Sequence, residues 1–379
     1  MHNFDPARAE ALYPAAYLDL MEAFRHLSMR IPDDPDLVLG LLDSPVLTGI
    51  CQDRTSTCAE RAVLYEALSY GDPGALLACP GPSLSGIIIR ELGDDAQRER
   101  FFDLVASRKA RTFMAVTEPN KGSDAGGMET MLDTDHRLHG EKWLVGNGSV
   151  AQVGTVLHRT GPSPFSIGVA VLYPDQLDSP QVLRRRIPLA ALQGARLSQF
   201  VFSGLEIPPE LQLGMHLRPL ERGMMALIRT FYRMRPCVAA MAIGSAQAVL
   251  DVISTAKLAV TREQRMLHER LLHRVAFARA LNRHAASAVD HGGAYTAHVA
   301  AAKAAATAAA EQVARDLPRL IGVQTWATEP WFVKAFADLH GFEWMEGATD
   351  IQRLGLYDAY VQRDAAASRT ADAELAQPV

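Results

Sequence analysis

Residues 116 to 124 read Val-Thr-Glu-Pro-Asn-Lys-Gly-Ser-Asp and lie where the pattern of apolar residues along the chain changes. Upstream, residues 5 to 112 carry apolar side chains at helical spacing, which predicts a helical N-terminal unit. Downstream, as far as about Leu213, short β-rich runs alternate with turn residues, a pattern typical of strands. We expect strands at residues 113–117, 137–145, 154–158, 166–172 and 200–207. Together they predict a small antiparallel sheet domain.

Helical character returns after Pro219 and dominates the rest of the chain. The segments that we expect to be helical are residues 220–258, 262–290, 295–319 and 331–339. The alanine-rich run from Ala300 to Ala310 favours helix strongly and is not a linker. Three long helices followed by a shorter one predict an antiparallel four-helix bundle.

The predicted fold class is therefore α+β, mainly α, with one sheet domain between two helical parts. The expected domains are an N-terminal helical domain (residues 1–112), a middle antiparallel β domain (113–217), a C-terminal four-helix bundle (218–364) and a flexible tail (365–379). We expect the tail to be loose because it is poor in apolar residues and cannot bury enough surface to offset its ordering.

The bulk composition argues against several classes of partner. A formal net charge of -5 gives no basic field for phosphate backbones, so we expect no nucleic-acid binding. Few cysteines without paired short spacing are typical of a reduced, cytoplasmic protein. No stretch reaches the ~20 uninterrupted apolar residues that span a bilayer, so we expect no membrane segment. His268 and His273 belong on different faces of one helix, so we expect both at the surface and no metal site.

Short motifs occur in a fixed order along the chain. Val116 to Asp124 resembles the T-E-P-x-x-G-S-D signature of the acyl-CoA dehydrogenase family. Further segments resemble that family's motifs: Leu138 to Trp143, Gly194 to Ser198 (G-x-R-x-S), Phe202 to Pro208 (F-x-x-x-x-V-P), Phe231 to Leu250, and Glu346 to Arg353 (E-G-T-x-x-I-Q-R). Because they keep family order and spacing over roughly residues 60 to 360, the resemblance predicts the family's fold.

The resemblance implies an oxidoreductase acting on CH–CH groups, which takes the α-proton of an acyl thioester while a hydride leaves the β-carbon for FAD. That α-proton is weakly acidic, so the base must be a carboxylate in a dry pocket. Glu346 falls on the family's base position, whereas Met234 occupies the alternative position on the long helix. Arg235 matches an arginine beside the base, where its charge would favour the ionised carboxylate. Glu343 is expected to be a solvated neighbour.

The resemblance also places one part of an FAD site within this chain. Thr117 and Ser123 match the family. The family's W-x-T, whose tryptophan packs on the ring and whose threonine donates to it, is Leu-Val-Gly here and ends at Gly146. Near the base, the family's threonine and the next polar position become Ala348 and Asp350. We therefore expect FAD, held by an altered set of contacts.

A neighbouring subunit supplies the rest of the cofactor site in this family. The R-x-x-F-G segment begins here at Arg262 and lacks its phenylalanine and glycine. The Q-x-x-G-G-x-G-F loop aligns with residues 319–326 and keeps only Gly322 among its glycines. Because the family's bundles pack on one another, the resemblance implies a homodimer or homotetramer, or a heteromer with a homologous subunit.

On the substrate side, the resemblance places Ser123, Tyr232, Met234 and Gly347 near the acyl thioester. Tyr232 stands where the family has an acidic residue beside the CoA end. This difference leaves two partners open, acyl-CoA and an acyl carrier protein, the latter as in biosynthetic members of the family.

Several functions follow from this pattern of retained and altered positions. The first is α,β-desaturation of an acyl thioester with FAD. The second is one subunit of a heteromeric dehydrogenase, in which another chain supplies the residues that bind the phosphate groups of the cofactor. The third is a flavin-free enzyme that uses Glu346 for dehydration, isomerisation or cyclisation. The fourth is a non-catalytic, partner-binding subunit.

Overall fold

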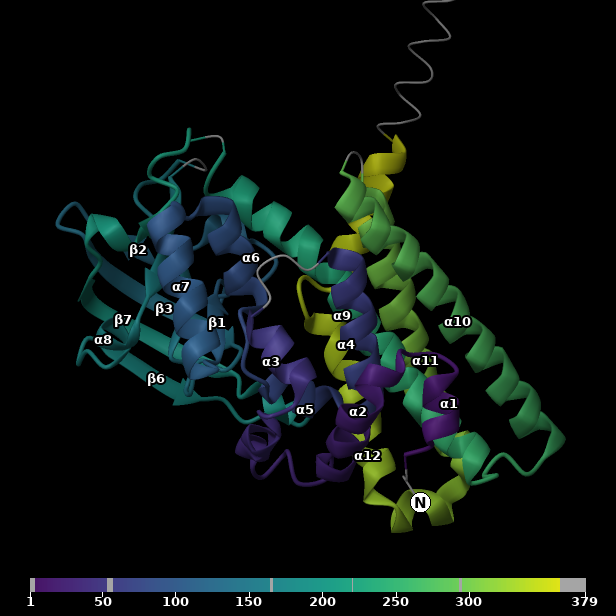
Figure 1. Cartoon of the computed structure of the whole chain (residues 1–379). Coiled ribbons are helices and arrows are strands. Elements are labelled where there is room, and N and C mark those ends of the chain that lie inside the picture. Colours follow the sequence, from purple (N-terminus) through teal and green to yellow (C-terminus); the bar gives the residue numbers. More distant parts are fainter. Residues whose placement is uncertain (1–3, 53–56, 164–165, 220, 293–294, 362–379) are drawn as a thin grey trace, which may run out of the picture.

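The computed structural model of the protein, described over residues 4–52, 57–163, 166–219, 221–292 and 295–361, has one sheet that lies at one side of the molecule (Figure 1). Helical parts precede and follow this sheet in the chain. The chain begins in the helices of the first part, crosses into the sheet, and ends in long helices that form the other half of the molecule. The expected tail at residues 365–379 lies outside the described residues.

The first helical part fits the prediction of helices up to residue 112. Its α-helices are α1 (Pro6–Glu10), α2 (Leu18–Leu27), α3 (Pro45–Gln52), α4 (Cys58–Gly71), α5 (Pro73–Ala78), α6 (Ser83–Leu92) and α7 (Asp95–Arg108). Reciprocal side-chain caps fix where two of them start, with Thr57 and Glu60 at α4 and Asp94 and Gln97 at α7. Lys109, in the left-handed conformation, ends α7 and turns the chain toward the sheet.

The sheet is mixed rather than purely antiparallel. Its strands are β1 (Thr112–Ala115), β2 (Met131–Leu132), β3 (Arg137–Val145), β4 (Val153–Arg159), β5 (Ile167–Leu172), β6 (Val182–Arg186), β7 (Ser198–Glu206) and β8 (Gln212–Leu213), with a short helix α8 (Pro174–Leu177) before β6. The strand order is β6-β7-β3-β2-β4-β5-β8, and β1 pairs with β4. Both β1 and β2 run parallel to β4, so the antiparallel expectation is wrong for these pairs. Long connections that leave the sheet and return to it allow such parallel pairing.

Three strands were not predicted, each for a local reason. β2 and β8 each span only two residues, too few to show the alternation that marks a strand. β6 carries the run Arg184–Arg186 and lies at one end of the strand order. Charged residues are typical of edge strands because they discourage pairing with another chain.

The second helical part is built around α9 (Met224–Thr255). It continues with α10 (Arg262–His291), α11 (Thr296–Thr328), α12 (Pro330–Gly341), the 3-10 turn η6 (Phe342–Trp344) and a helix over residues 349–361. α9 packs against α10 and α11, and also against α4 of the first part. At the crossing with α4, a Cβ on Gly244 would lie 2.0 Å from the carbonyl oxygen of Glu66, so the close approach of these helices requires glycine.

The burial of α9 accounts for one unexpected property of this helix and corrects one expectation about a neighbouring residue. Within the described residues, α9 has the length and apolar composition of a membrane-spanning helix, which we did not expect. However, 94% of its most apolar window is buried inside the protein, as in the core helix of a bundle. His268 of α10 packs on this core and is not at the surface, because its Nε2 lies 2.8 Å from the carbonyl oxygen of Leu250. His273 is exposed, as expected.

Candidate active site

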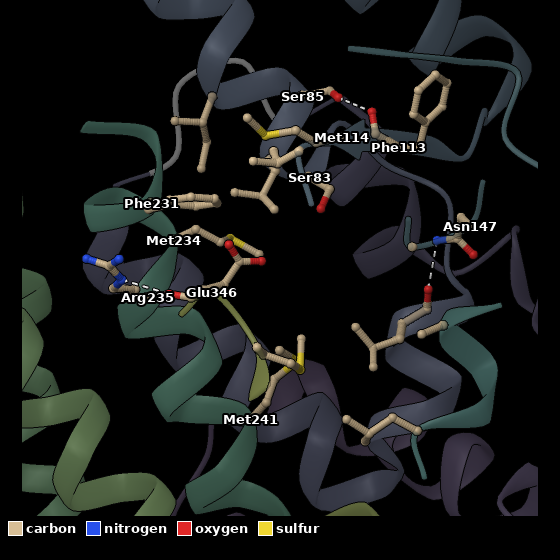
Figure 2. Close-up of a pocket in the computed structure, with 18 of the residues that line it drawn as sticks. Ser83, Ser85, Phe113, Met114, Asn147, Phe231, Met234, Arg235, Met241 and Glu346 are labelled. Carbon is tan, nitrogen blue, oxygen red and sulfur yellow. Dashed lines mark hydrogen bonds between the residues drawn. The ribbon is translucent and has the colours of Figure 1, made fainter. Parts of the chain in front are cut away.

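A cavity of about 1450 Å³ lies between the sheet, the N-terminal half of α9 and the turn that follows α12 (Figure 2). Its lining is mainly apolar. The volume exceeds the roughly 300–1,000 Å³ of a site for one drug-sized ligand. The cavity therefore has room for a cofactor ring and an acyl chain together.

Glu346 lies in the turn between η6 and the helix at residues 349–361, and it lines this cavity. Its φ of 53° is in the left-handed region that a residue with a side chain rarely adopts. Figure 2 shows the carboxylate pointing into the cavity beside Met234 of α9. A strained backbone of this kind costs on the order of 1–3 kcal/mol and persists only where its surroundings hold it.

Burial in this apolar cavity raises the pKa of the Glu346 carboxyl from 4.5 to about 7. The charges of Arg235 and Lys303 act in the opposite direction and lower that pKa, but by less than burial raises it. The side chain is half-buried by its exposed area because it opens onto the cavity, yet protein surrounds the carboxylate, so desolvation dominates. A base with a pKa near 7 is suited to proton abstraction at neutral pH.

Main-chain hydrogen bonds fix the turn around Glu346. Arg235 Nε donates to the carbonyl oxygen of Glu346 at 3.0 Å. Lys303, from α11, donates through Nζ to the carbonyl oxygens of Glu343 and Gly347, at 3.1 and 2.8 Å. The Glu343 carboxylate accepts from the backbone N–H of Thr349 at 3.0 Å and from its hydroxyl at 2.5 Å. Glu343 is therefore a structural part of the turn and not the solvated neighbour that we expected.

Lys303 was missed by the sequence analysis, although a signal for it exists. It is the lone charged residue within the alanine run of residues 300–310 and is fully buried, at 0% exposure. A buried lysine needs partners for its ammonium group, so a charged residue on the apolar face of a predicted helix marks a polar contact in the core.

Arg235 contacts the turn that carries the base. Its guanidinium lies 4.6 Å from the centre of the Tyr232 ring, and Nε reaches the main chain of Glu346. Burial lowers the pKa of Arg235 from its ordinary value, but an arginine stays charged at any physiological pH. Arg235 thus holds the backbone of Glu346 while its charge favours the ionised carboxylate.

The sheet side of the cavity carries Thr117, Ser123, Trp143 and Gly146. The pairing of β3 with β7 is irregular between Lys142 and Val145, and this irregularity shapes the wall at Trp143. Sequence analysis did not single out Trp143, since it precedes the position where the family's tryptophan was sought. The wall therefore has an aromatic side chain even though residue 144 is leucine.

Figure 2 shows Asn147 across the cavity from Glu346, and it too lines the wall. Its Nδ2 donates to the carbonyl oxygen of Leu77 at 3.0 Å. Its Oδ1 is buried and has no hydrogen-bond partner among the described residues. A buried unpaired acceptor is costly, so a ligand with an N–H donor would complete this site.

Some predicted site residues lie together and others do not. The residues that line the one cavity are Thr117, Ser123, Met234, Arg235, Gly146, Glu346, Gly347 and Ala348. Tyr232 is absent from this lining and packs against Tyr295 on the other side of α9. Asp350 faces solvent, where it pairs with Arg353 at 3.0 Å, because it lies on the outer face of the last helix. Neither Tyr232 nor Asp350 can therefore contact a ligand in this cavity from its present position.

Arg262 and Gly322 lie away from the cavity. Arg262 is exposed at the first position of α10, and Gly322, with φ 76°, interrupts α11. The two segments meet at one end of the bundle, where Gln264 Nε2 donates to the carbonyl oxygen of Arg319 at 2.9 Å.

The order of helices, sheet and helices, with a carboxylate in the cavity between them, defines a class of three-part oxidoreductases. The middle domain of acyl-CoA dehydrogenase matches residues 113–205, and the C-terminal domain of acyl-CoA dehydrogenase matches residues 221–360. Together these matches cover more than half of the chain, which belongs to the acyl-CoA dehydrogenase family.

Individual relatives agree with this assignment. The chain is 27% identical over 319 residues to the probable medium-chain specific acyl-CoA dehydrogenase 2, mitochondrial, of Caenorhabditis briggsae, covering 79% of this chain and 75% of that one. The FAD complex of PigA has the same fold, with a TM-score of 0.78, 18% identity, and coverage of 92% and 98% of the two chains. The prolyl acyl carrier protein oxidase AnaB also has this fold, with a TM-score of 0.78 and 15% identity. The match covers 92% of this chain and 99% of that one.

The residues present fit the FAD that this family implies. Thr117, Ser123 and Trp143 line the sheet side of the cavity, and the unpaired Oδ1 of Asn147 awaits a donor there. A Cβ added at Gly146 would meet nothing closer than 4.0 Å, so no side chain obstructs this part of the wall. These residues would hold the cofactor ring, and FAD would supply a hydride acceptor.

Proposed function

We propose that the protein desaturates an acyl thioester at its α,β-carbons, with Glu346 as the base. The observation that carries this proposal is a carboxylate with a pKa of about 7 that points into an apolar cavity. Glu346 takes the proton from the α-carbon, and the electron pair of that C–H bond becomes the new double bond as hydride leaves the β-carbon. FAD, when bound, accepts that hydride.

The protein side chains act mainly on the proton transfer. Phe231 and Met234 help to exclude water from the carboxylate, which makes it a stronger base. Once Glu346 has taken the proton it is neutral, and burial favours the neutral form. Arg235 keeps the backbone of Glu346 in place throughout, since it contacts a main-chain oxygen that does not titrate.

The experiment that tests this proposal compares the wild-type protein with Glu346→Gln. A panel of short-chain, medium-chain and aryl acyl-CoA thioesters is incubated with FAD-loaded protein, and bleaching of the flavin absorbance reports hydride transfer. We expect bleaching with at least one acyl group in the wild-type protein and none with the variant. Equal bleaching by both proteins would contradict the role of Glu346.

For the form of the substrate, we propose an acyl group carried on a carrier protein. In support, a prolyl acyl carrier protein oxidase has the same fold as this chain. Turnover of one acyl group is compared on CoA and on a phosphopantetheinylated carrier protein. A higher kcat/KM on the carrier is the expected result, and preference for free CoA would count against it.

A second candidate is a flavin-free enzyme that uses Glu346 for dehydration, isomerisation or cyclisation of a thioester. It is favoured by Gly146 and Ala348, which lack the hydroxyl groups that the family places near the flavin. A purified protein that stays colourless after FAD addition would support it. Co-purification of a homologous second chain would instead favour a heteromeric dehydrogenase, and an unchanged cellular phenotype in Glu346→Gln would favour a partner-binding subunit.

We further propose a cytoplasmic homodimer or homotetramer. In support, the segments around Arg262 and Gly322 lie at an end of the bundle away from the cavity of their own chain. Light scattering of the FAD-loaded protein tests the assembly, and a monomer would count against this part.

A further inference from the structure

Lys303 lies beneath the turn that carries Glu346. Its side chain is fully buried within α11, at 0% exposure. Its Nζ donates to the carbonyl oxygens of Glu343 at 3.1 Å and Gly347 at 2.8 Å, which lie on either side of Glu346 in the chain. Burying an ammonium group is costly unless it is well satisfied, and these main-chain oxygens are what satisfies this one.

We propose that Lys303 is a positioning residue for the base, which holds the turn so that the Glu346 carboxylate points into the cavity. The proposal rests on the function proposed above for Glu346. Lys303 touches neither substrate nor cofactor in this account, because it does not line the cavity. It acts on the reaction only through Glu346.

The backbone of the turn shows why it needs to be held. Glu346 and Gly347 have consecutive positive φ angles, of 53° and 92°. Glycine adopts such a conformation freely, but glutamate does not. Within the turn, Arg235 bonds the carbonyl oxygen of Glu346, so without Lys303 the oxygens of Glu343 and Gly347 would lose their ammonium donor. The Gly347 oxygen would keep the longer hydrogen bond from Gln352 Nε2, at 3.5 Å. The turn could then relax and withdraw the carboxylate from the cavity.

Lys303 also affects the charge of the base. The titratable and charged groups near this turn are Arg235 and Tyr232 on α9, Lys303 on α11, Glu343 on η6, and His340 on α12, whose ring lies 2.7 Å from the Glu311 carboxylate of α11. Among them, Arg235 and Lys303 lower the pKa of Glu346. Burial in turn lowers the pKa of Lys303 to about 8, so it is mostly charged at neutral pH. Loss of this cation should raise the pKa of Glu346 further.

The decisive variant is Lys303→Met, which keeps the length and apolar stem of the side chain and removes its donors and charge. Infrared difference spectra of each protein against its own Glu346→Gln counterpart isolate the titration of one carboxyl and need no substrate. We expect the midpoint in Lys303→Met to rise by about one pH unit or more. The matched control is Lys142→Met, which removes an equally buried ammonium that pairs with Glu118 at 2.9 Å in the sheet domain. It should leave the Glu346 midpoint unchanged.

Turnover gives the second readout, with the acyl thioester that bleaches the wild-type flavin as the probe. We expect kcat of Lys303→Met to fall by about 10²-fold, the effect of a misplaced catalytic group, while KM stays within about twofold. Lys303→Arg, which retains a cation and several donors, should recover part of the loss. An unshifted Glu346 midpoint in a folded Lys303→Met protein would overturn the proposal.

A different measurement covers the case in which Lys303→Met does not fold. The lysine side chains of wild-type protein and of Glu346→Gln are labelled with ¹³C at Cε, and Lys303 is titrated by NMR. Because coupling between two sites is reciprocal, loss of the carboxylate should lower the pKa of Lys303. An unchanged Lys303 titration would contradict the proposal. Full activity of Glu346→Gln would instead contradict the proposed function. Failure of the role of Lys303 and failure of the proposed function are thus distinguishable.

Discussion

The two walls of the cavity differ in how completely side chains build them. On the base wall, Arg235 and Lys303 bond three carbonyl oxygens around the turn, and Glu346 is held in a strained conformation. On the sheet wall, Gly146 has no side chain, and Asn147 keeps an unpaired oxygen. In the proposed function, the contacts that hold the proton acceptor therefore all come from one chain, whereas the sheet wall needs a ligand to satisfy Asn147.

Removing the base should give the largest effect. Glu346→Gln keeps the shape of the side chain but cannot accept a proton, and general bases typically contribute about 10²–10⁴-fold to the rate. We expect kcat to fall by at least that range in stopped-flow measurements of flavin bleaching. Glu60→Gln is the matched control, because Glu60 also lines the cavity and glutamine can replace it in the cap of α4. A comparable loss in the control would mean that the base wall has no special role.

The pH profile tests whether the base wall is as dry as the structure indicates. Abstraction needs the ionised carboxylate, and burial raises the pKa of Glu346 to about 7. Well below that pH, kcat/KM should fall about tenfold per unit, which amounts to about fiftyfold from pH 7 to pH 5. A profile that is flat down to pH 5 would show a carboxylate with ordinary solvation.

Stability offers a third test of the same wall. The folded pKa of Glu346, about 7, is above its ordinary value of 4.5, so its contribution to stability is present below pH 4.5 and is lost as pH rises through 7. Glutamine is always neutral and avoids that loss. At pH 8, Glu346→Gln should therefore unfold in urea with a free energy about 3 kcal/mol higher than wild type, an order-of-magnitude figure. At pH 4 the two proteins should be nearly equal, and equality at pH 8 would contradict the buried charge.

The smallest effect concerns the sheet wall. Gly146→Thr places a hydroxyl where the family has one, and the nearest atoms to the new Cβ, Ala195 O and Leu197 Cδ2, are 4.0 Å away. One added hydrogen bond is worth about 1 kcal/mol, so FAD should bind roughly fivefold more tightly in a fluorescence titration. Gly146→Val, which has the same shape without the hydroxyl, is the control. Equal tightening by both variants would point to packing instead of hydrogen bonding.

The positions of Glu346 and Met234 in one cavity could be predicted because short side-chain motifs mark them. The segment from Glu346 to Arg353 and the signature at residues 116–124 predicted the domain order and a base in the last turn. Met234 lies beside Glu346 in the cavity, as its motif position implied.

The contacts that hold the base could not be predicted from those motifs. Within the described part of the chain, the hydrogen bonds of Lys303 go to main-chain oxygens, which leave no pattern in the sequence of the turn. Asp350 was placed near the cofactor by motif position alone, but the last helix turns it toward solvent. The parallel pairing of β1 with β4 depends on a long connection, and local alternation of side chains carries no information on strand direction.

The most direct measurement follows the proton itself and requires no redox step. An acyl thioester deuterated at the α-carbon, from those that bleach the flavin, is incubated in ordinary water with wild-type protein or with Glu346→Gln, and mass spectrometry follows loss of the label. We predict washout of deuterium by the wild-type protein and none above background by the variant. Equal washout by both proteins would contradict the assignment of Glu346 as the group that takes the α-proton.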